Sequence, residues 1–184
     1  MDKRTLALRY YGDPVLRKKA EPVASVTPEI REVIAGLFDT MYRERGIGLA
    51  APQVGISQRI FVLDVEGEGG ERAKLALVNP ALVRFTGSVV GEEGCLSIPG
   101  IHADVKRHAD VTFEGLDESG ARLTVHAQGL LARALQHELD HLDGVLFVDR
   151  LSAIRRKLLE PKLARMQIGD ADDSSSSASV SPSF

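Results

Sequence analysis

Apolar residues recur at every third or fourth position through residues 28–45, "PEIREVIAGLFDTMYRER", which is the spacing of one face of an amphipathic helix. The apolar positions are Ile30, Val33, Ile34, Leu37, Phe38 and Met41. Thr27 suits the N-cap of this helix, Pro28 suits its first position, and Gly46 can end it. The pattern therefore predicts a helix over 28–45.

The middle of the chain is rich in β-forming residues that are separated by Gly and Asp clusters. The strands that this pattern predicts are 58–64, 75–78, 81–90, 103–113 and 121–127. The sequence "DESG" at 117–120 has the composition of a tight turn. It indicates that the last two strands form a hairpin.

A second helix is expected over 129–143, "GLLARALQHELDHLD", with Gly144 as its C-terminal stop. Its leucine and alanine residues are spread around most of the helix circumference. A helix with this distribution is usually buried at the centre of a core.

The residues after Asp149 predict a last helix that Pro161 kinks or splits. The Ser- and Asp-rich residues 169–184 cannot bury enough apolar surface to order themselves, so we expect a disordered tail without catalytic residues. Residues 1–168 are then expected to form one catalytic domain.

Composition narrows the class of protein. A chain of 184 residues has the size of one domain, and 43% hydrophobic and 27% charged residues are typical of a soluble globular protein. A net charge of −3 argues against a phosphate-tracking, sequence-specific nucleic-acid binder. We expect neither a signal peptide nor a membrane span, and the single cysteine excludes an intrachain disulfide. These features together predict a cytoplasmic protein.

The second helix carries a candidate metal site. His137 and His141 are four residues apart, so on a helix they project from the same side and can share one ion. Glu138 is offset by about 100°, which keeps it near the ion as a base without making it a ligand. Two imidazoles and a carboxylate in an otherwise aliphatic helix are costly to bury unless they are paired or bind a metal.

A third ligand is needed, and two known arrangements do not fit. In one of them a histidine follows the helix, but that position here is Phe147. In the other a later helix supplies a glutamate, but Glu160 lies among basic residues beside a proline. The candidates that remain are Cys95, His102, His108 and His126. A thiolate with two imidazoles suits Zn²⁺, Fe²⁺, Co²⁺ or Ni²⁺ and leaves a fourth position for water, which favours catalysis over a structural site.

The sequence "GIGLAAPQVG" at 46–55 matches G-x-G-x-x-A, a dinucleotide-binding pattern. That pattern requires a strand before the first glycine, whereas a helix is expected here. A loop with small residues and the amide of Gln53 suits a different task, the donation of hydrogen bonds to a developing oxyanion.

Three motifs in one order, "GIGLAAPQVG" at 46–55, "EGCLSIP" at 93–99 and "QHELDH" at 136–141, resemble those of the peptide deformylase family. The likeness extends over roughly residues 5–155. It implies an α+β fold in which short antiparallel sheets pack around a central buried helix with the His-Glu-x-x-His motif, followed by a C-terminal helix. It also implies removal of the formyl group from the N-terminal formyl-methionine of newly made polypeptides, with release of formate.

The resemblance also implies roles for individual residues. Cys95, His137 and His141 would be the metal ligands, with iron(II) as the usual ion and zinc, nickel or cobalt as substitutes. Glu138 would be the general base and acid. The oxyanion would be stabilised by the side chain of Gln53 and the backbone N–H of Leu96, and Gly48 would line the substrate. His102 stands where some family members carry an arginine that helps to hold the peptide.

Two other functions use the same helix. A zinc endopeptidase would cleave internal peptide bonds and take a carboxylate as its third ligand, and a non-enzymatic metal-binding module would supply four protein ligands. Separately, the segment 151–165 is basic within an acidic protein. Because the implied substrate emerges from the ribosome, this segment is a candidate for transient contact with ribosomal RNA.

Overall fold

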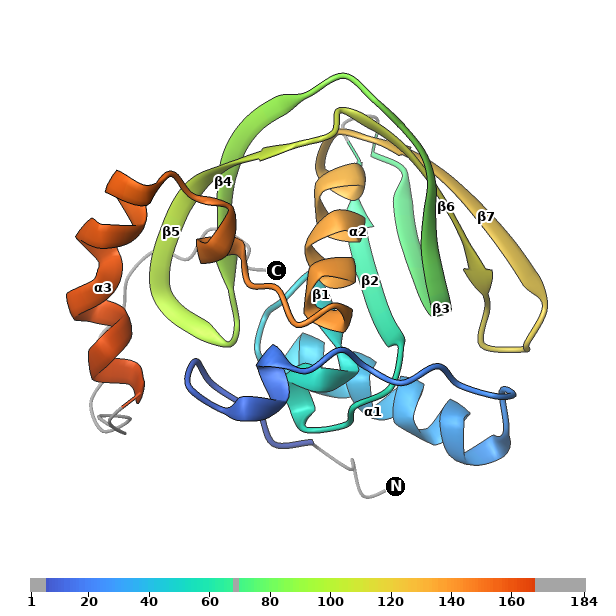
Figure 1. The fold of residues 1–184 in the computed structure, drawn as a ribbon. Helices are drawn as coiled ribbons and strands as arrows, with labels where there is room; N and C mark the ends of the chain where they lie inside the picture. The colour runs from blue at the N-terminus through green and yellow to red at the C-terminus, as the bar shows by residue number, and fades with distance from the viewer. Residues whose placement is uncertain (1–5, 68–69, 168–184) are drawn as a thin grey trace.

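The computed structural model describes residues 6–67 and 70–167 (Figure 1). The strands are β1 (Gly48–Ala50), β2 (Ile60–Glu66), β3 (Arg72–Thr86), β4 (Val89–Cys95), β5 (Ile98–Arg107), β6 (Asp110–Leu116) and β7 (Arg122–Gln128). The helices are α1 (Pro28–Arg43), α2 (Gly129–Leu142) and α3 (Ala153–Gln167), with short 3-10 helices η1 (Pro14–Arg17), η2 (Ala51–Val54) and η3 (Phe147–Arg150). None of the helices within the described ranges combines the length and apolar character needed to cross a membrane.

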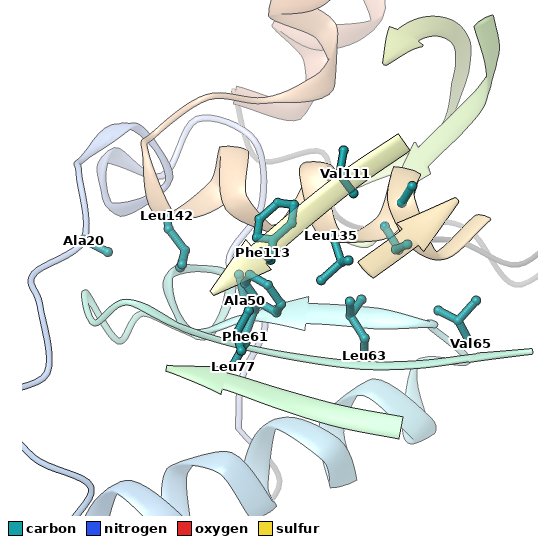
Figure 2. Close-up of a cluster of buried hydrophobic side chains, with 13 residues drawn as sticks. Ala20, Ala50, Phe61, Leu63, Val65, Leu77, Val111, Phe113, Leu135 and Leu142 are labelled. Carbon is teal, nitrogen blue, oxygen red and sulfur yellow. The ribbon is translucent and has the colours of Figure 1, made fainter. Parts of the chain in front are cut away.

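Five strands form an antiparallel sheet in the order β1-β2-β3-β6-β7, and both of its faces are covered. Alternate residues of β2 point to opposite faces, so Phe61 and Leu63 join the core on the α2 side while Ile60 and Val62 join the core on the α1 side. Figure 2 shows the first of these cores, in which Leu135 of α2 packs over the sheet. Because β2 is buried on both faces, its first four residues, 60–63, form a continuous apolar run before Asp64.

Strands β4 and β5 form a separate two-stranded sheet, and α2 runs between it and the larger sheet (Figure 1). The predicted strands 81–90 and 103–113 were each wrong in extent, because each spans two strands in different sheets. The chain leaves the large sheet after Thr86 and returns to it at Asp110. The two crossings lie side by side, since the N–H of Ala109 donates to the carbonyl of Thr86 at 3.2 Å. Single-strand periodicity does not reveal such a change of sheet.

The predicted break between 78 and 81 is an irregularity inside β3, not a loop. Asn79 has a positive φ of 52°, and the register with β6 shifts between Val78 and Ala81. Pro80 has no N–H to donate, so a proline here is tolerated where the ladder is already interrupted. The hairpin β6–β7 with its turn at 117–120 is confirmed.

The helix ends follow the local sequence with one correction. Thr27 caps α1 by accepting from the N–H of Ile30, and Gly144, at φ 72°, follows the end of α2 as expected. The left-handed residue after α1 is Arg45, at φ 58°, and not Gly46. Gly46 instead packs closely against Leu96, since a Cβ there would lie 2.8 Å from the Leu96 Cδ1 and the leucine side chain would have to shift.

Helix α2 is buried over most of its length, as predicted, while its first turn is exposed at Leu130. Helix α3 continues through Pro161, so the proline does not split it. The expected tail, residues 169–184, lies outside the described residues.

Candidate metal centre

Three metal-binding side chains from two separate elements meet beside α2. One ligand atom from each of Cys95, His137 and His141 lies within 4.8 Å of the others, and all three residues are buried. The Cys95 Sγ and the His141 Nε2 are 3.3 Å apart. The structure thus brings together the three residues predicted as ligands.

The backbone of each element explains this convergence. His137 and His141 are one turn apart on α2, with ring centroids 5.0 Å from each other. Cys95 ends β4, and a two-residue turn, Leu96–Ser97, leads directly into Ile98, which pairs with Cys95. The turn holds the thiol at the edge of the small sheet that faces α2.

The protonation states of the cluster follow from its burial. Burial raises the pKa of the Cys95 thiol to about 12, and the charge of Glu138 adds to this effect while hydrogen bonds from Ser97 oppose it. Burial also lowers the pKa of His141 well below 6.5, so its imidazole is neutral and can offer a lone pair at neutral pH. A cation is therefore needed to make the thiol a thiolate.

Glu138 lies next to His137 on α2, beside the Cys95–His137–His141 cluster. It is fully buried, and neither carboxylate oxygen has a hydrogen-bond partner among the described residues. Burial, followed by repulsion from Glu93, raises its pKa well above 4.5. Gly48 allows this placement, because a Cβ on Gly48 would lie 2.4 Å from the Glu138 Oε1.

Gln53 points its amide toward Cys95. Its Oε1 accepts from the N–H of Ala50 at 2.9 Å, which orients the amide. Its Nε2 then lies 3.6 Å from the Cys95 Sγ and 3.2 Å from the Ser97 Oγ. Leu96, the other predicted oxyanion donor, occupies the turn next to Cys95.

A buried ion-pair network around Glu93 supports His137. No role was assigned to the residues of this network from the sequence. The Glu93 carboxylate accepts from His137 Nδ1 at 2.9 Å, from Arg107 at 2.8 and 2.9 Å, and from Arg133 at 2.9 Å. A carboxylate on Nδ1 keeps the proton there and leaves the lone pair on Nε2, the form that binds metals. Arg133 is four residues before His137 on α2, a helical spacing that could have identified it, whereas Arg107 gives no local signal.

The other candidate ligands lie elsewhere. His102 is exposed on β5 with its ring over Gly94, and His108 contacts Phe85 in a tilted arrangement with ring centroids 4.1 Å apart. The His126 ring is hydrogen-bonded to the Thr112 hydroxyl at 3.0 Å. Phe147 stacks on His137 at 6.2 Å, and Glu160 is exposed on α3. Neither the carboxylate ligand that an endopeptidase needs nor a fourth protein ligand joins the cluster in the described residues.

The cluster fits a divalent cation on its own chemistry. Besides the oxygens of Glu138, the His141 Nδ1 is buried and has no hydrogen-bond partner among the described residues. Buried polar atoms of this kind are costly unless something satisfies them. A soft sulfur with two imidazole nitrogens is a donor set for Fe²⁺, Zn²⁺, Co²⁺ or Ni²⁺.

The fold and the site are those of a metal-dependent hydrolase, because a Cys–His–His cluster that could hold a metal ion lies beside a buried glutamate. Residues 5–157 match the family model of polypeptide deformylase. The chain is 43% identical over 157 residues to a peptide deformylase of Thermodesulfovibrio yellowstonii, covering 85% of this chain and 95% of that protein. It is 47% identical over 161 residues to one of Alkalilimnicola ehrlichii, covering 88% and 90%.

A solved structure leads to the same family. The crystal structure of a peptide deformylase from Legionella pneumophila superposes with a TM-score of 0.82 at 41% identity, covering 92% of this chain and 99% of that chain. The chain belongs to the polypeptide deformylase family. It is therefore an enzyme of the class that removes the N-formyl group from newly made polypeptides.

Proposed function

We propose that Cys95, His137 and His141 hold one divalent cation, and that Glu138 acts beside it as the general base and acid of deformylation. The observation that carries this proposal is the convergence of one sulfur and two imidazoles next to a buried carboxylate. The substrate is the formyl-methionyl end of a nascent peptide, in keeping with the family.

Iron(II) is the proposed physiological ion, supported by the usual metal of the family and by a donor set that suits it. When bound, such a cation polarises a carbonyl and lowers the pKa of a coordinated water from 15.7 toward about 7. The Cys95 thiol gives up its proton on binding, and Glu93 holds His137 in the required tautomer.

Glu138 carries the proton. Its pKa is raised well above 4.5, mainly by burial, which makes the carboxylate a stronger base than an exposed glutamate. It accepts the proton of the attacking water at a carboxylate oxygen. It then delivers that proton to the amide nitrogen as the formyl C–N bond breaks, so that formate and a free amine leave.

Gln53 and the backbone N–H of Leu96 stabilise the negative oxygen of the tetrahedral intermediate. The support is that the Gln53 amide is oriented by Ala50 and directed at Cys95, while Leu96 follows Cys95 in a tight turn. Such preorganised donors cost no reorganisation during the reaction. Gly48 lines the substrate beside Glu138, where its missing side chain leaves room.

The test is formate release from formyl-Met-Ala by iron-loaded protein that is prepared without oxygen. The matched control is Glu138→Gln, which keeps the shape of the side chain, with metal content measured for both proteins. We expect release by the native protein and a large loss in the variant at equal metal content. Equal rates, or no release by either protein, would refute the proposed function.

We further propose that α3 contacts the ribosome. Arg155, Arg156, Lys157, Lys162 and Arg165 make it basic. Ile154 and Leu158, one turn apart, are 76% and 74% exposed, which is unusual for large apolar side chains. Ribosome co-sedimentation should fall as salt rises and should weaken in Lys157→Glu; Lys74→Glu, on the distant strand β3, is the control. Absent or salt-independent co-sedimentation would remove this proposal.

Two further proposals follow from the family match, which spans 5–157. Residues 1–168 form one catalytic domain, and 169–184 contribute nothing to catalysis. The second proposal is a cytoplasmic location, which a nascent-peptide substrate supports. The domain proposal has a direct test. A truncation after residue 168 that keeps full deformylase activity is the expected result, and loss of activity would contradict it.

A further inference from the structure

A cavity of about 290 Å³ lies against a face of α2 that does not carry the metal cluster. Gln136, Leu139 and Asp140 of α2 line it, and the average direction of these three positions lies about 120° around the helix from that of His137 and His141. The deformylation described above uses none of these three side chains. A cavity at the lower end of the usual ligand-site volumes suits a small ligand.

The cavity carries more positive than negative charge. Lys106, Arg107 and Arg150 line it, and Asp140 is its only acidic lining residue within the described chain. Both oxygens of Asp140 are already engaged, by Arg150 at 2.5 Å and by Arg107 at 2.6 Å. The acid is therefore neutralised and offers little repulsion to an incoming anion.

Neighbouring charges do not remove this excess. Glu93 lies behind Arg107 and balances it, but Glu93 also pairs with Arg133, so three arginines share two carboxylates. Lys106 makes no ion pair among the described residues and adds another positive charge. The buried Arg107 and Arg133 are matched by the buried Glu93 and Asp140, so the unmatched positive charge lies toward solvent on Lys106 and on Arg150, whose side chain is 43% exposed. An anion in the cavity would pair with this exposed positive charge.

We propose that this cavity is a binding site for a small oxyanion. Lys106 supplies a point charge, the Ser88 hydroxyl, which also lines the cavity, can donate, and the Arg150 Nη1 is not used in its bonds to Asp140. The Arg107 guanidinium adds positive charge, but Glu93 and Asp140 already engage its three nitrogens. The occupant is inorganic phosphate or the carboxylate formate. The site rests on its own residues and stands whether or not the proposed catalytic roles are correct.

The experiment titrates phosphate and, separately, formate into zinc-loaded protein by calorimetry, with chloride holding the ionic strength constant. Lys106→Gln is the test variant, because Lys106 is exposed on β5 and lies outside the proposed catalytic residues. Lys162→Gln on α3 is the matched control for loss of one lysine. Equal metal content and equal formate release in all three proteins verify that the metal centre is intact.

We expect saturable binding that weakens about tenfold or more in Lys106→Gln, the effect of losing one charge-assisted hydrogen bond, and is unchanged in Lys162→Gln. Dependence on Lys106 for phosphate alone identifies phosphate as the occupant, and dependence for formate alone identifies a carboxylate. Binding that is absent for both anions, or that Lys106→Gln leaves unchanged, would overturn the proposal. Anion binding directly to the metal falls in this last group, since Lys106 does not affect it.

Discussion

Replacing Gly48 by alanine should displace the general base without touching the metal ligands. The added Cβ would meet the Glu138 Oε1 at 2.4 Å, and Cδ2 of Leu63 at 2.7 Å closes another side. Ordinary contact begins near 3.4 Å, so the carboxylate must retreat by about 1 Å. Glu138 has no hydrogen bond among the described residues to hold it against this shift. A misplacement of about 1 Å can lower a catalytic rate by about 10²-fold.

The assay is steady-state formate release with kcat and KM determined separately, together with metal content. We expect kcat to fall by about 10²-fold while metal content is unchanged, because the cysteine and histidines are not displaced. Gly67→Ala is the control, since its Cβ would only reach ordinary contact at 3.4 Å with the carbonyl of Glu71. A Gly48→Ala protein with full metal and a kcat close to that of the control would refute the assigned position of the base.

Three other predictions concern the surroundings of the metal centre. Glu93→Gln should cost about 3–5 kcal/mol in urea unfolding at neutral pH. Burial opposes the ionisation of Glu93, yet hydrogen bonds from Arg107 and His137 bring its pKa in the folded protein below the usual 4.5. The stability that Glu93 contributes is therefore present above pH 4.5 and fades as the pH falls toward the pKa of the folded protein. A difference in unfolding free energy between the native protein and Glu93→Gln that grows in acid would contradict this. Because the pKa of Cys95 is about 12, its thiol should add about one proton to those released on zinc binding near neutral pH, and Cys95→Ser should release about one proton fewer in calorimetry with two buffers. Gln53→Ala should lower kcat by about 10²–10³-fold at unchanged metal content, and a loss confined to KM would argue against oxyanion stabilisation.

Much of the fold could be predicted from local patterns. Period and capping residues located α1 and α2, and the scatter of leucine and alanine around α2 indicated its buried position. The change of sheet near Thr86 and Asp110 could not be predicted, because the residues on either side have the same β-forming character. What separates them is the tertiary pairing of β4 with β5, which one strand's sequence does not encode.

For the site, spacing on one helix indicated that His137 and His141 act together, and elimination reduced the third ligand to four candidates. Only the fold brings Cys95 to the pair while it keeps His102 at the surface. Arg107 lies outside all three motifs, at the far end of β5, so its bonds to Glu93 depend on the pairing of β4 with β5. Long-range ion pairs of this kind leave no pattern in a single sequence.

X-ray absorption of the zinc-loaded protein tests the centre most directly. One sulfur at about 2.3 Å, two nitrogens at about 2.0–2.1 Å and one further light atom that exchanges with solvent are the expected shell, and Cys95→Ser should lose the sulfur. A shell without sulfur, or one filled by four protein ligands, would contradict a metal held by Cys95, His137 and His141 with an open position beside Glu138.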